Sequence, residues 1–263
     1  MKNDAIEYKR RGAAGWAVLN RPDAMNAISP ELVEDLVEVM DAAQADEAVK
    51  ALVITGKGRA FSAGADLKFI KQAFGEPGFP TFNKFIRHLL LVFKRLEAFP
   101  KPVIAAVNGL ALAGGLELLL CCDVVIAAES ARIGDAHANF GLLPGGGGSA
   151  RLPRKVGPTW AKYLLFTGEF FPARDLVGPG LVNRVVPDGE LEAATEKLVA
   201  SIGKKSPLGL RYMKDLVNFG LEQSLETALY QEILAFQGYS QSKDIKEGLS
   251  AFNEKRTPSF VGK

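Results

Sequence analysis

Residues 101–123 read KPVIAAVNGLALAGGLELLLCCD, and this stretch decides the fold. Val103–Val107 is apolar throughout, which is typical of a strand covered on both faces of a parallel sheet. Asn108-Gly109 ends that strand, and Gly114-Gly115 precedes a second apolar run, Leu116–Cys122. Glycine pairs of this kind mark chain breaks between regular elements. The stretch therefore predicts a buried strand, a loop of small residues and a buried helix.

The same alternation of strand and helix extends to both sides of this stretch. Upstream, Ala51–Thr55 predicts another buried strand, and Phe82–Phe99 repeats apolar residues at helical spacing. Downstream, Val124–Ala127 predicts a strand and Leu191–Ile202 predicts a helix. Strands that alternate with helices predict an α/β core built on a parallel sheet.

The end of the chain differs from this core, because it predicts helices alone. Apolar residues occur on more than one face of each, which indicates burial against another body. We therefore divide the chain into a core at residues 1–200 and a C-terminal helical region at residues 201–263. The predicted helices of that region are Leu208–Phe219, Leu225–Gln237 and Asp244–Phe252.

Composition and charge exclude several classes of protein. The chain has 263 residues, of which 48% are hydrophobic and 24% charged, as in an ordinary globular protein. These values argue against a disordered chain, a coiled coil and a disulfide scaffold. The formal net charge of +2 is too small for a protein whose main partner is a nucleic acid or an acidic membrane.

The cysteines and the apolar runs predict a cytoplasmic protein. Cys121 and Cys122 are adjacent, so they have neither the spacing of a disulfide framework nor that of a metal site. We interpret them as small buried hydrophobes whose reduced state suits the cytosol. No apolar segment of the signal-peptide kind follows the first residues, and the longest apolar runs are too short to span a membrane.

Several familiar catalytic motifs are absent from the sequence. The chain has 2 histidines, His88 and His137, which excludes a multi-histidine metal site. It has no P-loop, and Gly146–Ala150 does not complete a nucleophile elbow. We interpret Ser149 in that segment as a helix N-cap and His88 as a residue on the flank of a helix.

Two glycine-containing loops are the candidates for a binding site. Phe61–Lys68 and Asn108–Glu117 are both loops of small residues that lead into a helix. Backbone N–H groups at a helix start have no partner within the helix, and small side chains let a ligand reach them. Two such loops that face each other would form an oxyanion hole with one donor from each. The alternative is tight packing of strand against helix, without a ligand.

Glu117 favours the catalytic alternative. It lies three residues after Gly114, within the otherwise apolar run Leu116–Cys121. Burying a carboxylate in such a run is expensive unless the group is paired. Glu117 is therefore either a carboxylate that favours the positive end of the helix dipole or a general acid/base with a raised pKa.

Taken in order, the motifs of this chain resemble the enoyl-CoA hydratase/isomerase, or crotonase, superfamily. The resemblance covers nearly the whole chain, and the order and spacing of its pieces make it specific. The matching pieces are Leu19–Pro22, Asn26-Ala27, Phe61–Lys68, Lys101–Gly109, Ala113–Glu117, Cys122-Asp123, Gly141–Gly148, Thr167-Gly168, Gly180–Asn183, Glu247-Gly248, Ala251-Phe252 and Lys255-Arg256.

The resemblance implies a fold, an assembly and a site. The implied fold is a spiral of ββα units with a C-terminal helical trimerisation region, forming a homotrimer or a dimer of trimers. The implied substrate is an acyl-CoA thioester, which itself supplies the acidity, so no metal or redox cofactor is expected. The implied residues are Ala65 and Gly114 as oxyanion donors, Glu117 as the first catalytic glutamate, and Ala63, Asp66, Leu67 and Lys68 along the coenzyme A path.

One position departs from the hydratase pattern. Counting back from Gly141 in Gly134–Pro144 places His137 where the hydratases of this family carry a second catalytic glutamate. If the segment is extended, Asp135 lies on the same side of the chain and orients His137 or shares its proton. The alternative is that His137 is a purely structural histidine.

These residues predict an enzyme that hydrates or isomerises a 2-enoyl thioester, with Glu117 as acid/base and His137 as the second group of the site. The alternative within the superfamily is a lyase, hydrolase or decarboxylase that acts on another acyl-CoA. The alternative of a different class is a non-catalytic scaffold that binds RNA or assembles a complex. We expect Phe69–Asn83, with its phenylalanines, to form one wall of the acyl pocket.

Overall fold

Residues 101–123 form two strands and a helix rather than one strand, a loop and a helix. In the computed structural model, which describes residues 1–75, 77 and 79–263, they are β5 (Val103–Val107), β6 (Leu110–Leu112) and α4 (Gly114–Leu120). The predicted strand and helix are confirmed. The additional strand is β6, whose small and apolar residues pair with two strands of a second sheet.

Two sheets form the core. The larger sheet is parallel except for the antiparallel pair β1–β2, and the smaller one is parallel except for the pair β8–β9. In order across the larger sheet, the strands are β1 (Ile6–Arg11), β2 (Ala14–Leu19), β3 (Ala51–Gly56), β5, β7 (Val124–Ala128) and β10 (Arg184–Val186). The smaller sheet contains β4 (Ala60–Ser62), β6, β8 (Arg132–Gly134) and β9 (Phe171–Pro172).

Successive ββα units wind between these two sheets. In each unit one strand joins the larger sheet, the next joins the smaller sheet, and a helix follows. This pattern confirms the predicted spiral. The units are β3–β4 with α2 (Leu67–Phe74) and α3 (Pro80–Glu97), β5–β6 with α4, and β7–β8 with η2 (His137–Phe140) and α5 (Gly148–Thr167).

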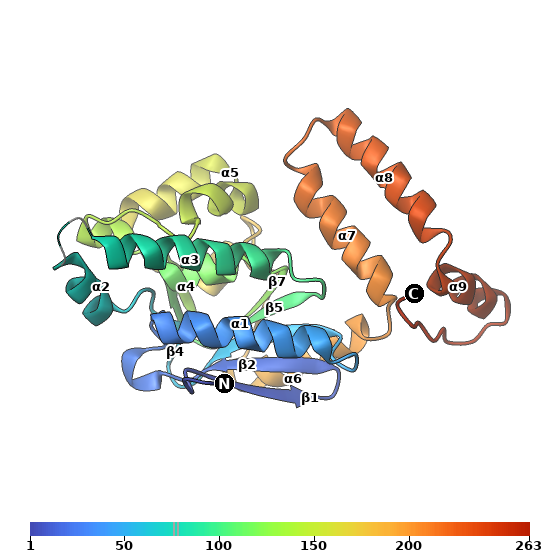
Figure 1. Cartoon of the computed structure of the whole chain (residues 1–263), viewed down its shortest axis with the longest axis horizontal. Coiled ribbons are helices and arrows are strands. Elements are labelled where there is room, and N and C mark those ends of the chain that lie inside the picture. Colours follow the sequence, from blue (N-terminus) through green and yellow to red (C-terminus); the bar gives the residue numbers. More distant parts are fainter. Residues whose placement is uncertain (76, 78) are drawn as a thin grey trace.

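Helices cover the larger sheet on both sides. α1 (Pro30–Ala45), which Ser29 caps, packs against β1 and β2 and lies beside α3, whereas α6 (Leu191–Ile202) packs against β5 and β7 (Figure 1). Every residue of α4 is buried between these layers. Three further 3-10 helices complete the core, namely η1 (Pro22–Ala24), η3 (Ala173–Leu176) and η4 (Asp188–Glu190).

The last three helices project from the core as an arm (Figure 1). They are α7 (Pro207–Gly220), α8 (Leu225–Tyr239) and α9 (Lys243–Asn253), each begun by a serine whose hydroxyl accepts a hydrogen bond from the first turn. The predicted boundary at residues 200/201 falls in the last turn of α6, just before this arm. None of the helices in the described residues is both long and apolar enough to cross a lipid bilayer.

The arm leaves many apolar side chains exposed. α8 has no buried residue at all. A chain that folds alone rarely exposes so large an apolar surface, so this face suits contact with another protein surface. Large exposed hydrophobic residues along α7, α8 and the turn between them are Met213, Val217, Phe219, Leu221, Leu225, Leu229, Tyr230, Ile233, Leu234 and Phe236.

The start of α5 corrects one sequence-based prediction. The residue at the N-cap of α5 is Gly147, with φ of +106°, and not Ser149. α5 therefore begins one residue before Ser149, within the glycine run itself. The backbone of α5 is non-helical at Gly157, where φ is +75°, so two helical segments meet there.

Candidate active site

The first glycine-containing loop is fixed by the segment that precedes α1. Ile28 N donates to Gly64 O at 2.7 Å, and Asp66 N donates to Ile28 O at 3.0 Å. These two bonds form a parallel bridge between Ile28 and Ala65. In such a bridge, the N–H of the central residue points to the opposite side, so the backbone N–H of Ala65 faces away from Ile28.

The second loop places Gly114 directly beside it. Gly114 is the first residue of α4, so its N–H has no acceptor within the helix. A Cβ on Gly114 would lie 3.4 Å from Ala65 N, and a Cβ on Gly64 would lie 3.3 Å from Gly114 N. The two loops are thus in contact, and glycine keeps the space between them open. The structure brings the predicted oxyanion donors, Ala65 and Gly114, together.

Glu117 follows one turn into α4, where only 2% of its surface is exposed. Its Oε1 accepts hydrogen bonds from Gly146 N and Gly148 N, both at 2.8 Å. Burial raises the pKa of this carboxyl, and the two N–H donors and the charge of His137 oppose that rise. Oε2 makes no hydrogen bond within the described residues, so this oxygen is available to a substrate or to water.

The glycine run 145–148 is the part of the site that sequence reasoning missed. A Cβ on Gly146 would lie 2.8 Å from Glu117 Oε2, and a Cβ on Gly148 would lie 3.2 Å from Glu117 Oε1. A side chain at either position would therefore crowd the carboxylate that these N–H groups bind. The sequence signal was the run itself, but a run of glycines does not reveal which acceptor its N–H groups meet.

His137 and Asp135 form a hydrogen-bonded pair, as predicted. His137 Nδ1 lies 2.9 Å from Asp135 Oδ1, and His137 N donates to Asp135 Oδ2 at 3.2 Å. The expected extended backbone is wrong, since Ala136 has φ of +61° and His137 begins η2. The two side chains still meet because an aspartate readily accepts the N–H two residues on, in an Asx-turn.

The environment of His137 favours the imidazolium form. Burial lowers the pKa of its ring, but the hydrogen bond to Asp135 and the charges of Asp135 and Glu117 outweigh burial, so the pKa is raised. The side chain of Asp135 is 1% exposed and that of His137 is 11% exposed. The structure therefore brings Glu117, His137 and Asp135 into one electrostatic group.

The residues predicted along the coenzyme A path lie at the start of α2. Asp66 caps this helix by accepting from Lys68 N and Phe69 N, and it pairs with Arg21 Nη2 at 2.7 Å. Burial raises the pKa of Asp66, but these partners outweigh burial and lower it overall. Ala63 is half-buried, whereas the side chains of Leu67 and Lys68 are exposed.

Aromatic residues at the end of α2 and at the start of α3 pack against one another. The ring of Phe74 lies 4.5 Å from that of Phe82 and 5.0 Å from that of Phe79, measured between centroids. Further along α3, a Cβ on Gly145 would lie 3.3 Å from Ile86 Cδ1. α3 thus connects the aromatic cluster to the loop on Glu117. Part of the predicted acyl-pocket wall, residues 76 and 78, lies outside the described residues.

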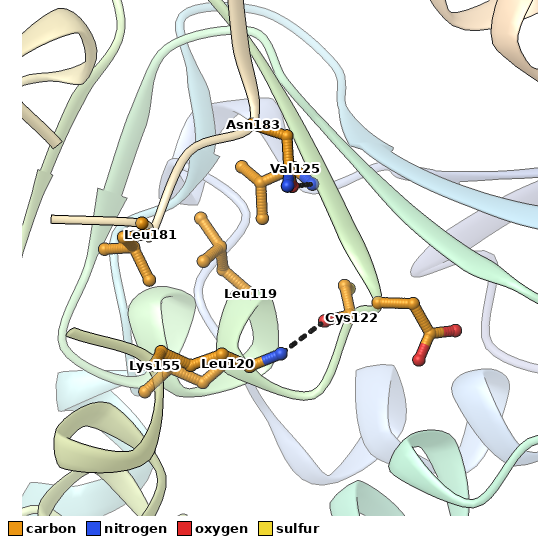
Figure 2. Close-up of a pocket in the computed structure, with 9 residues that line it drawn as sticks. Leu119, Leu120, Cys122, Val125, Lys155, Leu181 and Asn183 are labelled. Carbon is orange, nitrogen blue, oxygen red and sulfur yellow. Dashed lines mark hydrogen bonds between the residues drawn. The ribbon is translucent and has the colours of Figure 1, made fainter. Parts of the chain in front are cut away.

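A cavity of about 50 Å³ lies beside the C-terminal end of α4 (Figure 2). It is lined in part by Leu120, Cys122 and Leu181, and Lys155 Nζ donates to the Cys122 carbonyl at 3.3 Å. This space is of water size rather than substrate size.

Burial raises the pKa of the Cys121 thiol to about 12, so the cysteines are not reactive nucleophiles.

Comparison with known proteins agrees with this geometry. The family model for enoyl-CoA hydratase/isomerase matches residues 13–263. The crotonyl-CoA hydratase of Syntrophomonas wolfei is 40% identical over 248 residues, covering 93% of each chain. The 2,3-dehydroadipyl-CoA hydratase of Escherichia coli is 41% identical over 93% of this chain and 94% of its own.

Solved structures show the same fold. The enoyl-CoA hydratase of Bacillus anthracis superposes with a TM-score of 0.92 at 36% identity, covering 98% of this chain and all of its own. That of Polaromonas superposes with a TM-score of 0.93 at 32% identity, over 97% of this chain and 99% of its own. From the matched motifs, the ββα spiral and these relatives together, the chain belongs to the enoyl-CoA hydratase/isomerase family.

Proposed function

We propose that this protein adds water across the double bond of a 2-enoyl-CoA thioester. The observation that carries the proposal is the buried Glu117 carboxylate, fixed by two backbone N–H groups and electrostatically coupled to His137. The relatives named as crotonyl-CoA and 2,3-dehydroadipyl-CoA hydratases support this reaction class.

The two glycine-containing loops supply the first element of the reaction. The thioester oxygen would accept hydrogen bonds from Ala65 N and Gly114 N, whose loops lie in contact. These donors stabilise the enolate that forms when oxygen adds to C3, and losing one such donor typically costs about 3 to 4 kcal/mol. The thioester itself supplies the acidity at C2, so the proposal includes no metal or redox cofactor.

The charges of the site support a separate role for each acid/base group. Glu117, as the carboxylate, takes a proton from water, and the hydroxide oxygen bonds to C3 of the enoyl group. His137, as the imidazolium held by Asp135, gives a proton to C2 of the enolate. A proton then passes from Glu117 to His137, which restores the starting state of the enzyme.

Coenzyme A would approach along the start of α2. The half-buried Ala63 and the exposed Leu67 and Lys68 border this path, and Asp66 holds the helix start in place. The ammonium group of Lys68 suits the phosphates of the coenzyme, in addition to lining the path. We propose these residues as the substrate-binding set.

Isomerisation of the enoyl double bond is the second candidate function. The observation that favours it is His137 at the place of the second hydratase glutamate, because one base can move a proton between carbons without activating water. This reaction would use the same oxyanion donors and Glu117. It differs in needing no water at C3.

The assembly and location are part of the same proposal. The apolar residues exposed on α7 and α8 suit burial against further copies of the chain, which supports a homotrimer or a dimer of trimers. The free and buried Cys121 and Cys122 suit the reducing cytoplasm. The net charge of +2 gives no support to nucleic acid or an acidic membrane as partner.

The experiment is a panel of 2-enoyl-CoA and 3-enoyl-CoA thioesters of increasing chain length. Hydration is followed as loss of the conjugated thioester's ultraviolet absorbance, and isomerisation of the 3-enoyl substrates as its gain. Turnover of 2-enoyl substrates supports the hydratase, and turnover of 3-enoyl substrates alone supports the isomerase. Salt-sensitive RNA binding without thioester binding would overturn both and favour the scaffold alternative.

A further inference from the structure

Arg151 is a largely buried charged residue that contacts the glycine loop 145–148. It lies in the first turn of α5, and its side chain is 12% exposed. Its Nη1 donates to the Gly146 carbonyl at 2.8 Å, while its Nε and Nη2 both lie 3.0 Å from Glu97 Oε2 on α3. No sequence motif considered above assigns Arg151 a role.

The loop is therefore held from two sides. On one side the N–H groups of Gly146 and Gly148 bind Glu117, and on the other the carbonyl of Gly146 binds Arg151. A Cβ on Gly147 would lie 2.0 Å from Arg151 Nη1, so the guanidinium fills the space that a side chain would need. Glycines have wide backbone freedom, so the guanidinium restrains a turn that has no side chains of its own.

We propose that Arg151 is a positioning residue for Glu117, which holds the two N–H donors on the carboxylate through the Gly146 carbonyl and favours the ionised form by its charge. The proposal rests on the proposed function, because it takes Glu117 to act as a carboxylate. Arg151 acts on Glu117 through the glycine loop that lies between them, so it is not itself a catalytic residue.

The charges around Glu117 decide the direction of the effect. His137 and Arg151 favour the carboxylate, whereas Asp135, and burial above all, disfavour it. Glu97 partly offsets Arg151, since the two form an ion pair. Removing the guanidinium charge therefore raises the pKa of Glu117 and moves the acid limb of the pH profile of kcat/KM to higher pH.

The test compares Arg151→Met with Arg151→Lys and with a matched control. We expect Arg151→Met to move the acid limb to higher pH and to lower kcat up to about 10²-fold with little change in KM. Arg151→Lys keeps the charge and should keep the limb near its wild-type position. The control is Arg154→Met, since Arg154 lies on the same helix but is exposed and pairs with Glu222.

An independent readout separates this proposal from the proposed function. The infrared carboxyl band of Glu117, identified by subtracting the spectrum of Glu117→Gln, should titrate at higher pH in Arg151→Met than in wild type, whether or not a substrate is turned over. An unmoved band and limb in folded Arg151→Met, or an equal shift in Arg154→Met, would overturn the positioning role. If Arg151→Met fails to fold, Arg151→Lys provides the test. A shift of its acid limb as large as that expected for Arg151→Met would overturn the positioning role, because lysine keeps the positive charge.

Discussion

Replacing Asp135 by Asn removes the negative charge beside His137 while keeping an oxygen that can accept its Nδ1 proton. The two side chains meet at 2.9 Å and are almost fully buried. The imidazolium form of His137 therefore owes its stability largely to this carboxylate, assisted by Glu117. We expect Asp135→Asn to leave the fold intact and to lower the pKa of His137.

The geometry sets the size of the effect. Two unit charges about 4 Å apart interact by about 4 kcal/mol at an effective dielectric constant of about 20, which corresponds to about 3 pH units. The retained hydrogen bond to Asn and the remaining charge of Glu117 both reduce this change. We therefore expect the pKa of His137 to fall by about 1 to 2 pH units, toward or below its ordinary value.

The assay is the pH profile of kcat/KM for the best enoyl thioester of the panel. In the proposed mechanism His137 donates a proton, so activity is expected below the pKa of His137 and should be lost as the pH rises through it. The basic limb should move down by the same 1 to 2 pH units. At the pH of the wild-type limb, kcat/KM of the variant should be about tenfold lower for each pH unit of that displacement. At the acid end of the profile, Asp135→Asn should approach the wild-type rate.

A basic limb that stays in place would refute the reasoning, as would a loss of rate by the same factor at every pH. The first result would mean that His137 does not donate the proton, and the second that Asp135 only shapes the loop. Because Glu117 and His137 titrate together, each limb reports on the coupled pair. The Arg151→Met variant moves the other limb, so the two variants together assign both.

Two further predictions follow from the site and the arm. His137→Ala should lower turnover by about 10- to 10⁴-fold. His137→Glu should keep or raise crotonyl-CoA hydration, because a carboxyl group then occupies the position of the second hydratase glutamate. Full turnover by His137→Ala would make the histidine structural. Light scattering at micromolar concentration should give the mass of a trimer or hexamer, because the apolar surface of α7 and α8 is otherwise exposed to water. A mass of 28.3 kDa, that of a monomer, would contradict this prediction.

The layout of the fold was predictable because its signals are local. The apolar run of β5 and the glycine pair that begins α4 predicted a buried strand and a buried helix, and both are present. β6 was not predictable in this way, since a strand of three residues exists only through its partners β4 and β8. Hydrophobic periodicity reports burial and spacing, and it carries no information on such long-range pairing.

The site was predictable where one residue carries the chemistry. A carboxylate in an apolar helix drew attention to Glu117, whereas Asp135 and His137 meet through a turn and not through the extended backbone on which their expected pairing depended. The partners of Glu117 were not predictable, because the donors are backbone groups of Gly146 and Gly148. Arg151 was missed for a related reason, since its acceptor is a carbonyl, and any residue type supplies one.

Glu117→Gln tests the central claim most directly. The variant keeps the shape of the side chain but replaces Oε2 with an amide that cannot accept a proton. It should lose crotonyl-CoA hydration by at least about 10²-fold at every pH while binding the thioester as the wild type does by calorimetry. A Glu117→Gln variant with wild-type turnover would contradict the account, because the carboxylate in the first turn of α4 would then not be the acid/base of the site.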